Sequence, residues 1–152
     1  MTGQIGSSDQ RLEWEMTFLG RNLEALYRKR HYPLERAHYL LLLSLRNGPM
    51  SIGELAASLS LDHSTVTRQL AAMHRRNLVE RHPNPADGRS SLIEATDEGR
   101  RLADAMQSDR IRRVEMMTAD WSDADKEAFG RLLGRLNATL GARLGEDDEF
   151  RP

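Results

Sequence analysis

Apolar residues recur along the chain at helical intervals, and these stripes, with one β-hairpin among them, outline the predicted fold. The first stripe runs from Leu12 to Leu26 at intervals of four and three residues. It predicts a helix that ends near His31-Tyr32-Pro33, because the residue before a proline avoids the helical conformation. A second helix is predicted from about Pro33 to Asn47-Gly48, and its run Leu40–Leu43 is apolar nearly all round. This helix is therefore expected at the centre of the core.

Two shorter helices and a tight turn are predicted next. Ser51 and Glu54 have the spacing of a capping box, in which a serine and a glutamate three residues later cap each other's backbone. The first helix ends before Ser60-Leu61-Asp62, and Asp62 is the predicted N-cap of a second helix that reaches about Asn77. Two helices joined by so short a turn have the form of a helix-turn-helix.

A β-hairpin and two long helices complete the pattern. Residues 78–82 and 91–95 are predicted strands, and Asp87-Gly88 between them is a strong turn signal. Thr96 is the predicted cap of a helix over 97–117, and Ser122 that of a last helix whose apolar stripe reaches Leu144. The predicted fold class is mainly α: a winged helix-turn-helix with long N- and C-terminal dimerisation helices.

The outer helices are too long for the predicted core to cover. Each spans about 20 residues, or roughly 30 Å. Their apolar stripes must pack on one another in a bundle or on a second copy of the chain, and we favour a homodimer. The predicted division is an N-terminal dimerisation helix at 9–32, a DNA-binding lobe at 33–96, C-terminal dimerisation helices at 97–145 and an acidic tail at 146–152.

Composition narrows the class of protein. The chain of 152 residues has 22 basic and 23 acidic side chains and no cysteine, which excludes thiol-based redox sensing and cysteine-ligated zinc. It has no apolar run long enough to cross a bilayer and no pattern of a secretory signal, so we expect a cytoplasmic protein without a membrane partner. It has no Gly-rich phosphate loop and no nucleophile elbow, so we expect neither an enzyme nor a cofactor.

The helix that begins near Asp62 has an apolar and a polar face. At about 100° per residue, Val66, Leu70 and Met73 share the apolar face. Arg68 lies on the opposite face, where a guanidinium can bind a guanine in the major groove, and short hydroxyl side chains near a helix N-terminus suit phosphate. The predicted DNA contacts on this helix are Ser64, Thr65, Thr67, Arg68 and Arg75.

The hairpin supplies a second set of candidate contacts. Arg89 follows the Asp87-Gly88 turn, and an arginine on a protruding ribbon fits a narrow minor groove. Asp87 is predicted to pair with Arg89 or with Arg81 and so to set the direction of the guanidinium. Arg81, Asp87 and Arg89 thus complete the predicted set. The alternative is a winged helix that serves as a protein–protein module and binds no DNA.

Five segments of the chain carry a resemblance to a known family: residues 51–56, 62–70, 77–81, 85–90 and 95–99. Together they resemble the MarR family of bacterial transcriptional regulators. The resemblance implies a dimeric winged-helix protein, usually a repressor, that binds pseudo-palindromic double-stranded DNA. It implies DNA contacts from Thr67, Arg68 and Arg89, with Asp87 orienting the wing arginine. The chain differs from many members in that neither neighbour of Arg89 is basic.

The resemblance also implies a small-molecule effector. Many members of the family release DNA when a small aromatic or phenolic ligand binds between the dimerisation helices and the DNA-binding lobe. Trp14, Tyr27, His38 and Tyr39 lie near the junction of the first two predicted helices. Their rings could line a cleft for such a ligand, and the alternative is ordinary core and interface packing.

The five histidines do not predict a metal site. His31, Glu35 and His38 are spaced four and three residues apart, but Pro33 is expected to interrupt the helix between them. His63, His74 and His82 lack the spacing of metal ligands. Histidines at the surface or held by hydrogen bonds are the favoured interpretation.

Overall fold

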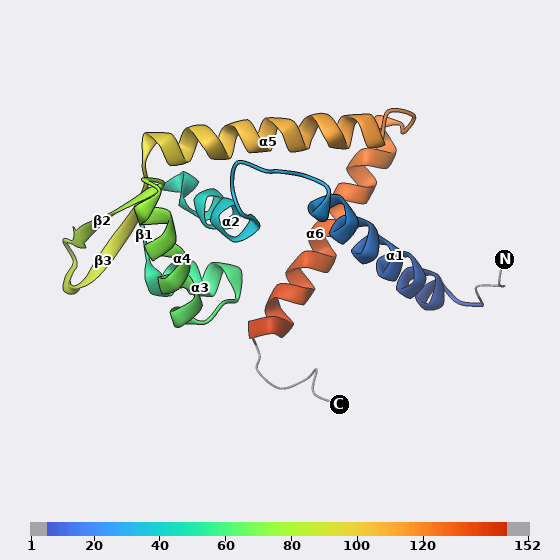
Figure 1. Ribbon diagram of the computed structural model, residues 1–152. Coiled ribbons are helices and arrows are strands. Elements are labelled where there is room, and N and C mark those ends of the chain that lie inside the picture. The colour runs from blue at the N-terminus through green and yellow to red at the C-terminus, as the bar shows by residue number, and fades with distance from the viewer. Residues whose placement is uncertain (1–5, 146–152) are drawn as a thin grey trace. The chain divides into compact units, whose positions relative to one another are not determined.

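The chain forms two units, residues 1–32 and residues 33–152. They are drawn in Figure 1 from a computed structural model that describes residues 6–145. The predicted acidic tail, 146–152, lies outside the described residues. Among the helices that are described, none is both long enough and apolar enough to cross a membrane.

The first unit contains α1 (Ser8–Arg28). The Ser7 hydroxyl caps this helix by accepting a hydrogen bond from the Gln10 N–H at 3.2 Å. The helix ends at Arg28 and so stops about one turn before Pro33, earlier than predicted. Every side chain of α1 is exposed or half-buried, including the predicted apolar stripe of Leu12, Met16, Leu19, Leu23 and Leu26.

The core of the second unit is built around α2 (Arg36–Ser44), which continues as a short 3-10 helix, η1 (Leu45–Asn47). The predicted start near Pro33 is wrong, because Glu35 has an extended backbone and is the N-cap. The central position of α2 is confirmed, since Leu41 and Leu42 are almost fully buried. Leu40 is the exception to the all-round burial expected, with 39% of its surface exposed.

The helix-turn-helix is formed by α3 (Ile52–Leu59) and α4 (His63–Arg75). The predicted capping box is present, because Ser51 accepts from the Glu54 N–H and Glu54 accepts from the Ser51 N–H. Val66, Leu70 and Met73 of α4 are at most 2% exposed, as their shared apolar face predicts. The opposite face of α4 is thereby directed to solvent.

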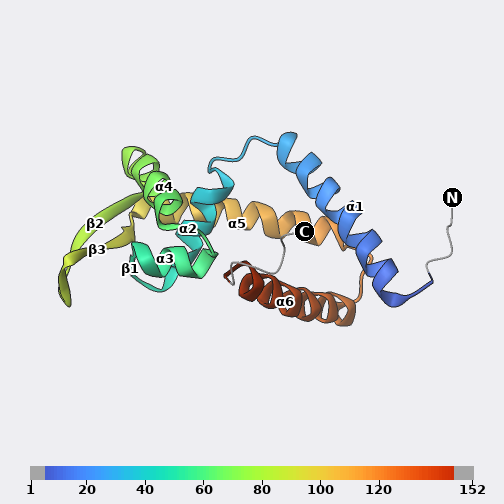
Figure 2. The same ribbon diagram turned by 90° about the horizontal axis from the view of Figure 1, so that it is seen from below.

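A three-stranded antiparallel sheet packs beside these helices in the order β1-β3-β2. β2 (Val79–Asn84) and β3 (Asp87–Ala95) form the predicted hairpin, and both Figure 1 and Figure 2 show it extending beyond the helices of the second unit. β1 (Met50–Ser51) is a two-residue strand that the sequence pattern did not predict. It pairs with Leu92 and Ile93 of β3 and anchors the inner end of the hairpin.

The turn of the hairpin lies at Pro85-Ala86, not at Asp87-Gly88 as predicted. Asn84 and Asp87 are register partners, so Asp87 already belongs to β3. The Asn84 side chain stabilises the turn by accepting a hydrogen bond from the Ala86 N–H at 3.0 Å. The register runs from Pro83–Ser91 directly to Asn84–Asp87. Residues 88–90 therefore bulge from the ladder of hydrogen bonds. The bulge bends the tip of the β2–β3 hairpin, which is the wing of the winged helix.

Two long helices follow the sheet, α5 (Asp97–Met117) and α6 (Asp123–Gly145). Thr96 caps α5 by accepting from the Gly99 N–H, as predicted, and also donates to the Asn77 carbonyl oxygen at 2.6 Å. A Cβ atom on Gly99 would lie 2.1 Å from the Leu78 carbonyl oxygen, so only glycine allows this close approach of α5 to the start of β2.

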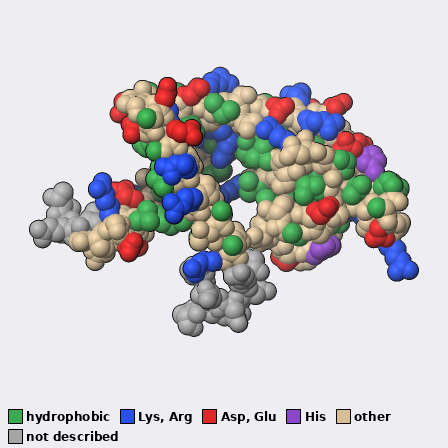
Figure 3. Space-filling view, turned by 180° about the vertical axis from the view of Figure 1, so that it is seen from behind, with side chains coloured by type: hydrophobic (Ala, Val, Ile, Leu, Met, Phe, Trp, Pro, Cys, Tyr) green, Lys and Arg blue, Asp and Glu red, His purple; other side chains and the backbone are tan. Residues whose placement is uncertain are grey.

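Both helices carry large apolar side chains at the surface, and Figure 3 shows hydrophobic groups lying between charged ones. Val114 of α5 is 54% exposed and Leu132 of α6 is 50% exposed.

Candidate nucleic-acid interface

The N-terminus of α4 is organised by one carboxylate. Ser60 has a left-handed backbone (φ 51°), which turns the chain sharply between α3 and α4. Asp62 is the N-cap predicted from the sequence, and its carboxylate accepts a hydrogen bond from the Thr65 N–H at 2.7 Å. Hydrogen bonds from the Ser64 hydroxyl, then from the Thr65 hydroxyl and N–H, hold the pKa of Asp62 well below its usual range. Asp62 is therefore ionised at neutral pH.

The three hydroxyls predicted as DNA contacts already donate hydrogen bonds within the protein. Ser64 and Thr65 both donate to the Asp62 carboxylate, the Thr65 hydroxyl at 2.7 Å. Thr67 donates to the His63 carbonyl oxygen at 2.8 Å. Ser64 and Thr67 are exposed and Thr65 is half-buried. In this arrangement the three oxygen atoms can accept hydrogen bonds, and each hydroxyl must rotate away from its present acceptor before it can donate to a phosphate.

The arginines of α4 differ in what they contact. Arg68 and Arg75 are exposed, and neither forms an ion pair with a residue between 6 and 145. Arg76, the C-cap of α4, instead donates to the Pro33 carbonyl oxygen at 3.0 Å. This bond ties the end of α4 to the segment that leads into α2. Arg68 and Arg75 thus remain as the available cations of the polar face.

The wing places Arg89 in the bulge at its tip, where the side chain is exposed. The Asp87 carboxylate accepts a hydrogen bond from the Arg89 backbone N–H at 3.0 Å. Within the described part of the chain, Asp87 pairs with neither the Arg89 nor the Arg81 guanidinium, which differs from the prediction. Asp87 therefore fixes the backbone that carries Arg89 and leaves the guanidinium without a carboxylate partner.

Arg81 of β2 lies beside α4. It lines a groove of about 330 Å³ between α4 and the sheet, together with Leu70, Ala71 and His74 of α4. Strand alternation places Arg81 on the same face as Val79. The groove therefore brings one wing arginine beside the helix that carries Arg68 and Arg75.

The four predicted effector contacts lie in different units. Trp14 and Tyr27 belong to α1, where the Trp14 ring lies 4.9 Å from that of Phe18 and the Tyr27 ring 5.7 Å from that of Tyr32. Tyr39 is buried in α2, with the Arg110 guanidinium 5.3 Å from its ring centroid. A common cleft for all four remains a prediction.

His38 differs from the expectation of a surface or hydrogen-bonded histidine. It is 1% exposed, and neither ring nitrogen has a hydrogen-bond partner among the described residues. Burial lowers the pKa of His38 because the charged ring loses its hydration, and the nearby Arg76 charge lowers it further. The nearby Glu35 charge acts in the opposite direction and raises this pKa. His38 is therefore a neutral part of the core.

Comparisons with known proteins agree with this geometry. The profile of the MarR family matches residues 32–90. The chain is 43% identical over 129 residues to YxaD of Bacillus subtilis, an uncharacterised HTH-type transcriptional regulator, and the alignment covers 83% of this chain and 90% of YxaD. The chain belongs to the MarR family. It is accordingly a DNA-binding transcriptional regulator and not an enzyme.

Solved structures share the fold of this chain. A MarR family protein from Bacillus stearothermophilus aligns with a TM-score of 0.72 and 25% identity, covering 86% of this chain and 93% of that one. FabT of Streptococcus pneumoniae, solved in complex with DNA, aligns with a TM-score of 0.72 and 19% identity, covering 88% of this chain and 97% of that one. The winged helix-turn-helix predicted from the sequence is confirmed by these likenesses.

Proposed function

We propose that this MarR protein is a homodimeric repressor that binds a pseudo-palindromic operator. The observation that carries the proposal is the set of exposed arginines on α4 and the wing that have no carboxylate partner among the described residues: Arg68, Arg75, Arg81 and Arg89. Such side chains are free to replace the counterions of DNA phosphates or to bind base edges.

In the proposed complex, α4 is the recognition helix and enters the major groove. Arg68 binds a guanine, because its guanidinium can donate two parallel hydrogen bonds to the O6 and N7 atoms. Ala71 is exposed on the same helix and small enough to let the backbone approach the bases. Arg75 contacts phosphate, as do the Ser64, Thr65 and Thr67 hydroxyls once they rotate. Arg89 enters the adjacent minor groove, while Asp87 holds its backbone and Arg81 contacts phosphate beside α4.

The dimer is proposed from the apolar side chains that remain at the surface. Leu12 and Trp14 of α1 are 55% and 54% exposed, and Met116 of α5 is 70% exposed. Large exposed apolar areas of this kind mark surfaces that bind another molecule. A second copy of the chain is the proposed occupant, because a two-fold axis then presents two copies of α4 to successive major grooves about 34 Å apart.

A small aromatic or phenolic effector is proposed to release the DNA. The support is the presence of aromatic side chains in α1 and α2, together with membership of the MarR family. The dimer is proposed to have two conformations, of which one spaces the recognition helices correctly for DNA and the other does not. The effector releases DNA if it binds more tightly to the second conformation.

Selection of DNA from a random duplex library by the purified full-length chain tests the proposal. We expect enrichment of two inverted half-sites with centres about 10–10.5 base pairs apart, and a particle of two chains by light scattering. Binding should weaken steeply as salt is raised, because phosphate contacts release counterions. Failure to enrich any sequence, with binding that is insensitive to salt, would instead favour the protein–protein module.

A reporter gene behind the selected operator tests the direction of regulation. Expression that rises when the gene for this protein is deleted supports repression, and expression that falls contradicts it. A screen of aromatic acids and phenols then tests the effector. Compounds that raise the melting temperature must also release DNA; stabilisation without release contradicts the proposed control.

A further inference from the structure

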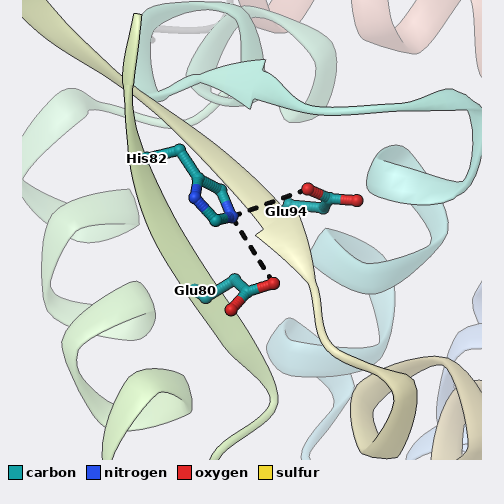
Figure 4. Close-up of side chains that lie close together, drawn as sticks. All are labelled: Glu80, His82 and Glu94. Atoms are coloured by element: carbon teal, nitrogen blue, oxygen red, sulfur yellow. Dashed lines mark ion pairs between the residues drawn. The ribbon is translucent and has the colours of Figure 1, made fainter.

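Three potential metal ligands meet on the wing, although the spacing of the histidines predicted none. Figure 4 shows the side chains of Glu80, His82 and Glu94 converging from β2 and β3. One ligand atom from each lies within 4.8 Å of the other two, and within residues 6–145 no other group of three histidines or carboxylates does so. The His82 Nε2 atom lies 3.4 Å from Glu80 Oε1 and 3.6 Å from Glu94 Oε2.

The strand register is what brings the three residues together. Glu80 and His82 are two positions apart on β2, so their side chains lie on one face of the strand. Glu94 is the register partner of Glu80 and therefore lies on that same face. Val79, Ile93 and Ala95 occupy the other face and are buried. The group is thus held by backbone pairing and lies on the solvent side of the sheet.

The separations fit a small divalent cation. Ligand atoms that bind tetrahedral zinc at 2.0–2.2 Å lie about 3.3–3.5 Å from one another. The distance from His82 to Glu80, 3.4 Å, lies within this range, and the distance to Glu94, 3.6 Å, lies just above it. The exposed Glu80 carboxylate can adjust by rotation. One imidazole and two carboxylates are a ligand set that zinc accepts, with a water molecule in the fourth position. The chain has no cysteine that would compete for the metal.

Glu94 also forms an ion pair with a residue outside the group. Arg100 of α5 lies 3.8 Å from Glu94 Oε1, while His82 faces the other carboxylate oxygen, Oε2. This ion pair leaves Oε2, the oxygen nearer to His82, available as a ligand. The same contact connects the wing to the first turns of α5.

We propose that Glu80, His82 and Glu94 bind one Zn²⁺ ion per chain and that the ion strengthens the binding of DNA. The zinc charge offsets two carboxylates on a hairpin that carries Arg89 toward the phosphates. The ion also joins β2 to β3, so that the wing is held in one conformation before it binds. The effect on DNA rests on the function proposed above, whereas zinc binding by the free protein does not.

Calorimetric titration of the chelator-treated, full-length chain with Zn²⁺ tests the site, and visible absorption of the Co²⁺ form reports the geometry of the ligands. We expect one ion per chain. His82→Gln and Glu94→Gln should each lower the affinity by at least about tenfold, whereas the control His31→Gln should leave it unchanged. All of these side chains are at least partly exposed, and circular dichroism verifies that each variant is folded.

Zinc affinity that is unchanged in His82→Gln and Glu94→Gln, or that is lost in His31→Gln, overturns the assignment. Fluorescence anisotropy with the selected operator tests the second half of the proposal. The affinity for DNA should rise with Zn²⁺ in the parent protein and stay constant in His82→Gln. If zinc binds to the wing and the affinity for DNA does not change, the regulatory role is wrong. This outcome differs from the absence of any DNA binding, which would contradict the proposed function instead.

Discussion

The arginines of the second unit differ sharply between α5 and the surface formed by α4 and the wing. On α5, three arginines pair with carboxylates three residues earlier in the same helix: Arg100 with Asp97 at 3.0 Å, Arg101 with Glu98 at 2.7 Å, and Arg112 with Asp109 at 2.9 Å. On α4, the positions three and four residues from Arg68 hold serine, threonine and alanine. Helical spacing therefore pairs these three arginines of α5 with acids and leaves Arg68 without a neighbouring acid.

This difference explains how a chain of nearly zero net charge can bind a polyanion. The paired arginines of α5 already have a carboxylate as counter-charge. Breaking that ion pair would cost free energy and so offset much of the binding free energy gained from a phosphate contact. In the proposed complex, the arginines of α4 and the wing exchange only solvent ions for phosphate. Local pairing, rather than the total number of basic residues, thus decides which surface is available to DNA.

Arg68→Ala should cause the largest loss. We expect the affinity for the selected operator to fall by about 1–3 kcal/mol and the preference at one base position to relax, because a bidentate base contact is removed. Fluorescence anisotropy with the operator and with single-base variants measures both effects. If affinity and base preference are both unchanged, Arg68 does not face the bases and the proposed docking of α4 is wrong.

Arg89→Ala should weaken binding less and more evenly across sequences. The wing arginine is expected to interact through charge in the minor groove, so the slope of log K against log salt should decrease by about 1. Titrations at several salt concentrations measure that slope. Complete loss of sequence discrimination would show that the wing reads bases directly.

Asp62→Ala should lower the melting temperature by removing the cap of α4. Because the pKa of Asp62 is depressed in the folded state from its usual 3.8, the unfolded chain binds the proton more tightly. The stabilisation is therefore complete above about pH 4 and is lost as the pH falls toward the folded-state value. Thermal melts from pH 7 to pH 3 should show the difference between parent and variant shrinking below pH 4.

A matched control for the cap is Asp120→Ala, an exposed aspartate for which the described residues provide no bonded partner. Its melting temperature should follow that of the parent protein at every pH. A difference between parent and Asp62→Ala that stays constant to pH 3 would contradict the role of the ionised cap.

Arg101→Ala should have the smallest effect and serves as the control for Arg68→Ala. Its guanidinium is exposed and already paired with Glu98. Surface pairs of this kind contribute about 0–1 kcal/mol to stability, and we expect a change in DNA affinity within about 0.5 kcal/mol. If Arg101→Ala lowers the affinity for DNA as much as Arg68→Ala does, pairing with a carboxylate does not decide which arginines contact DNA.

Much of the polar face of α4 could be predicted from the sequence, because helical periodicity is a local property. Val66, Leu70 and Met73 are buried as their spacing predicted, which leaves Arg68 on the outside. The Asp62 cap was likewise predictable from its position before an apolar stripe. The occupation of the Ser64 and Thr65 hydroxyls by that cap was not, because it depends on side-chain rotamers that spacing does not specify.

The wing is the region where local sequence signals gave the wrong strand register. A two-residue turn at Asp87-Gly88 would place Arg81 opposite Glu94, whereas the observed register places Glu80 there. A shift of one residue moves every side chain to the other face of a strand. The misplaced turn therefore concealed the convergence of Glu80, His82 and Glu94. Gly88 did not mark the turn because Pro85 and Ala86 form it without a glycine.

The close approach at Gly99 places the first turn of α5 directly against the segment that joins α4 to β2. No side chain fits between Gly99 and the Leu78 carbonyl oxygen, so a substitution at Gly99 would have to displace the backbone that ends α4 and starts β2. The hydrogen bond that the Thr96 hydroxyl donates to the Asn77 carbonyl oxygen stabilises the same contact. A side chain added at Gly99 is therefore expected to disturb the end of α4, the base of the wing and the start of α5 together, because all three meet at this contact.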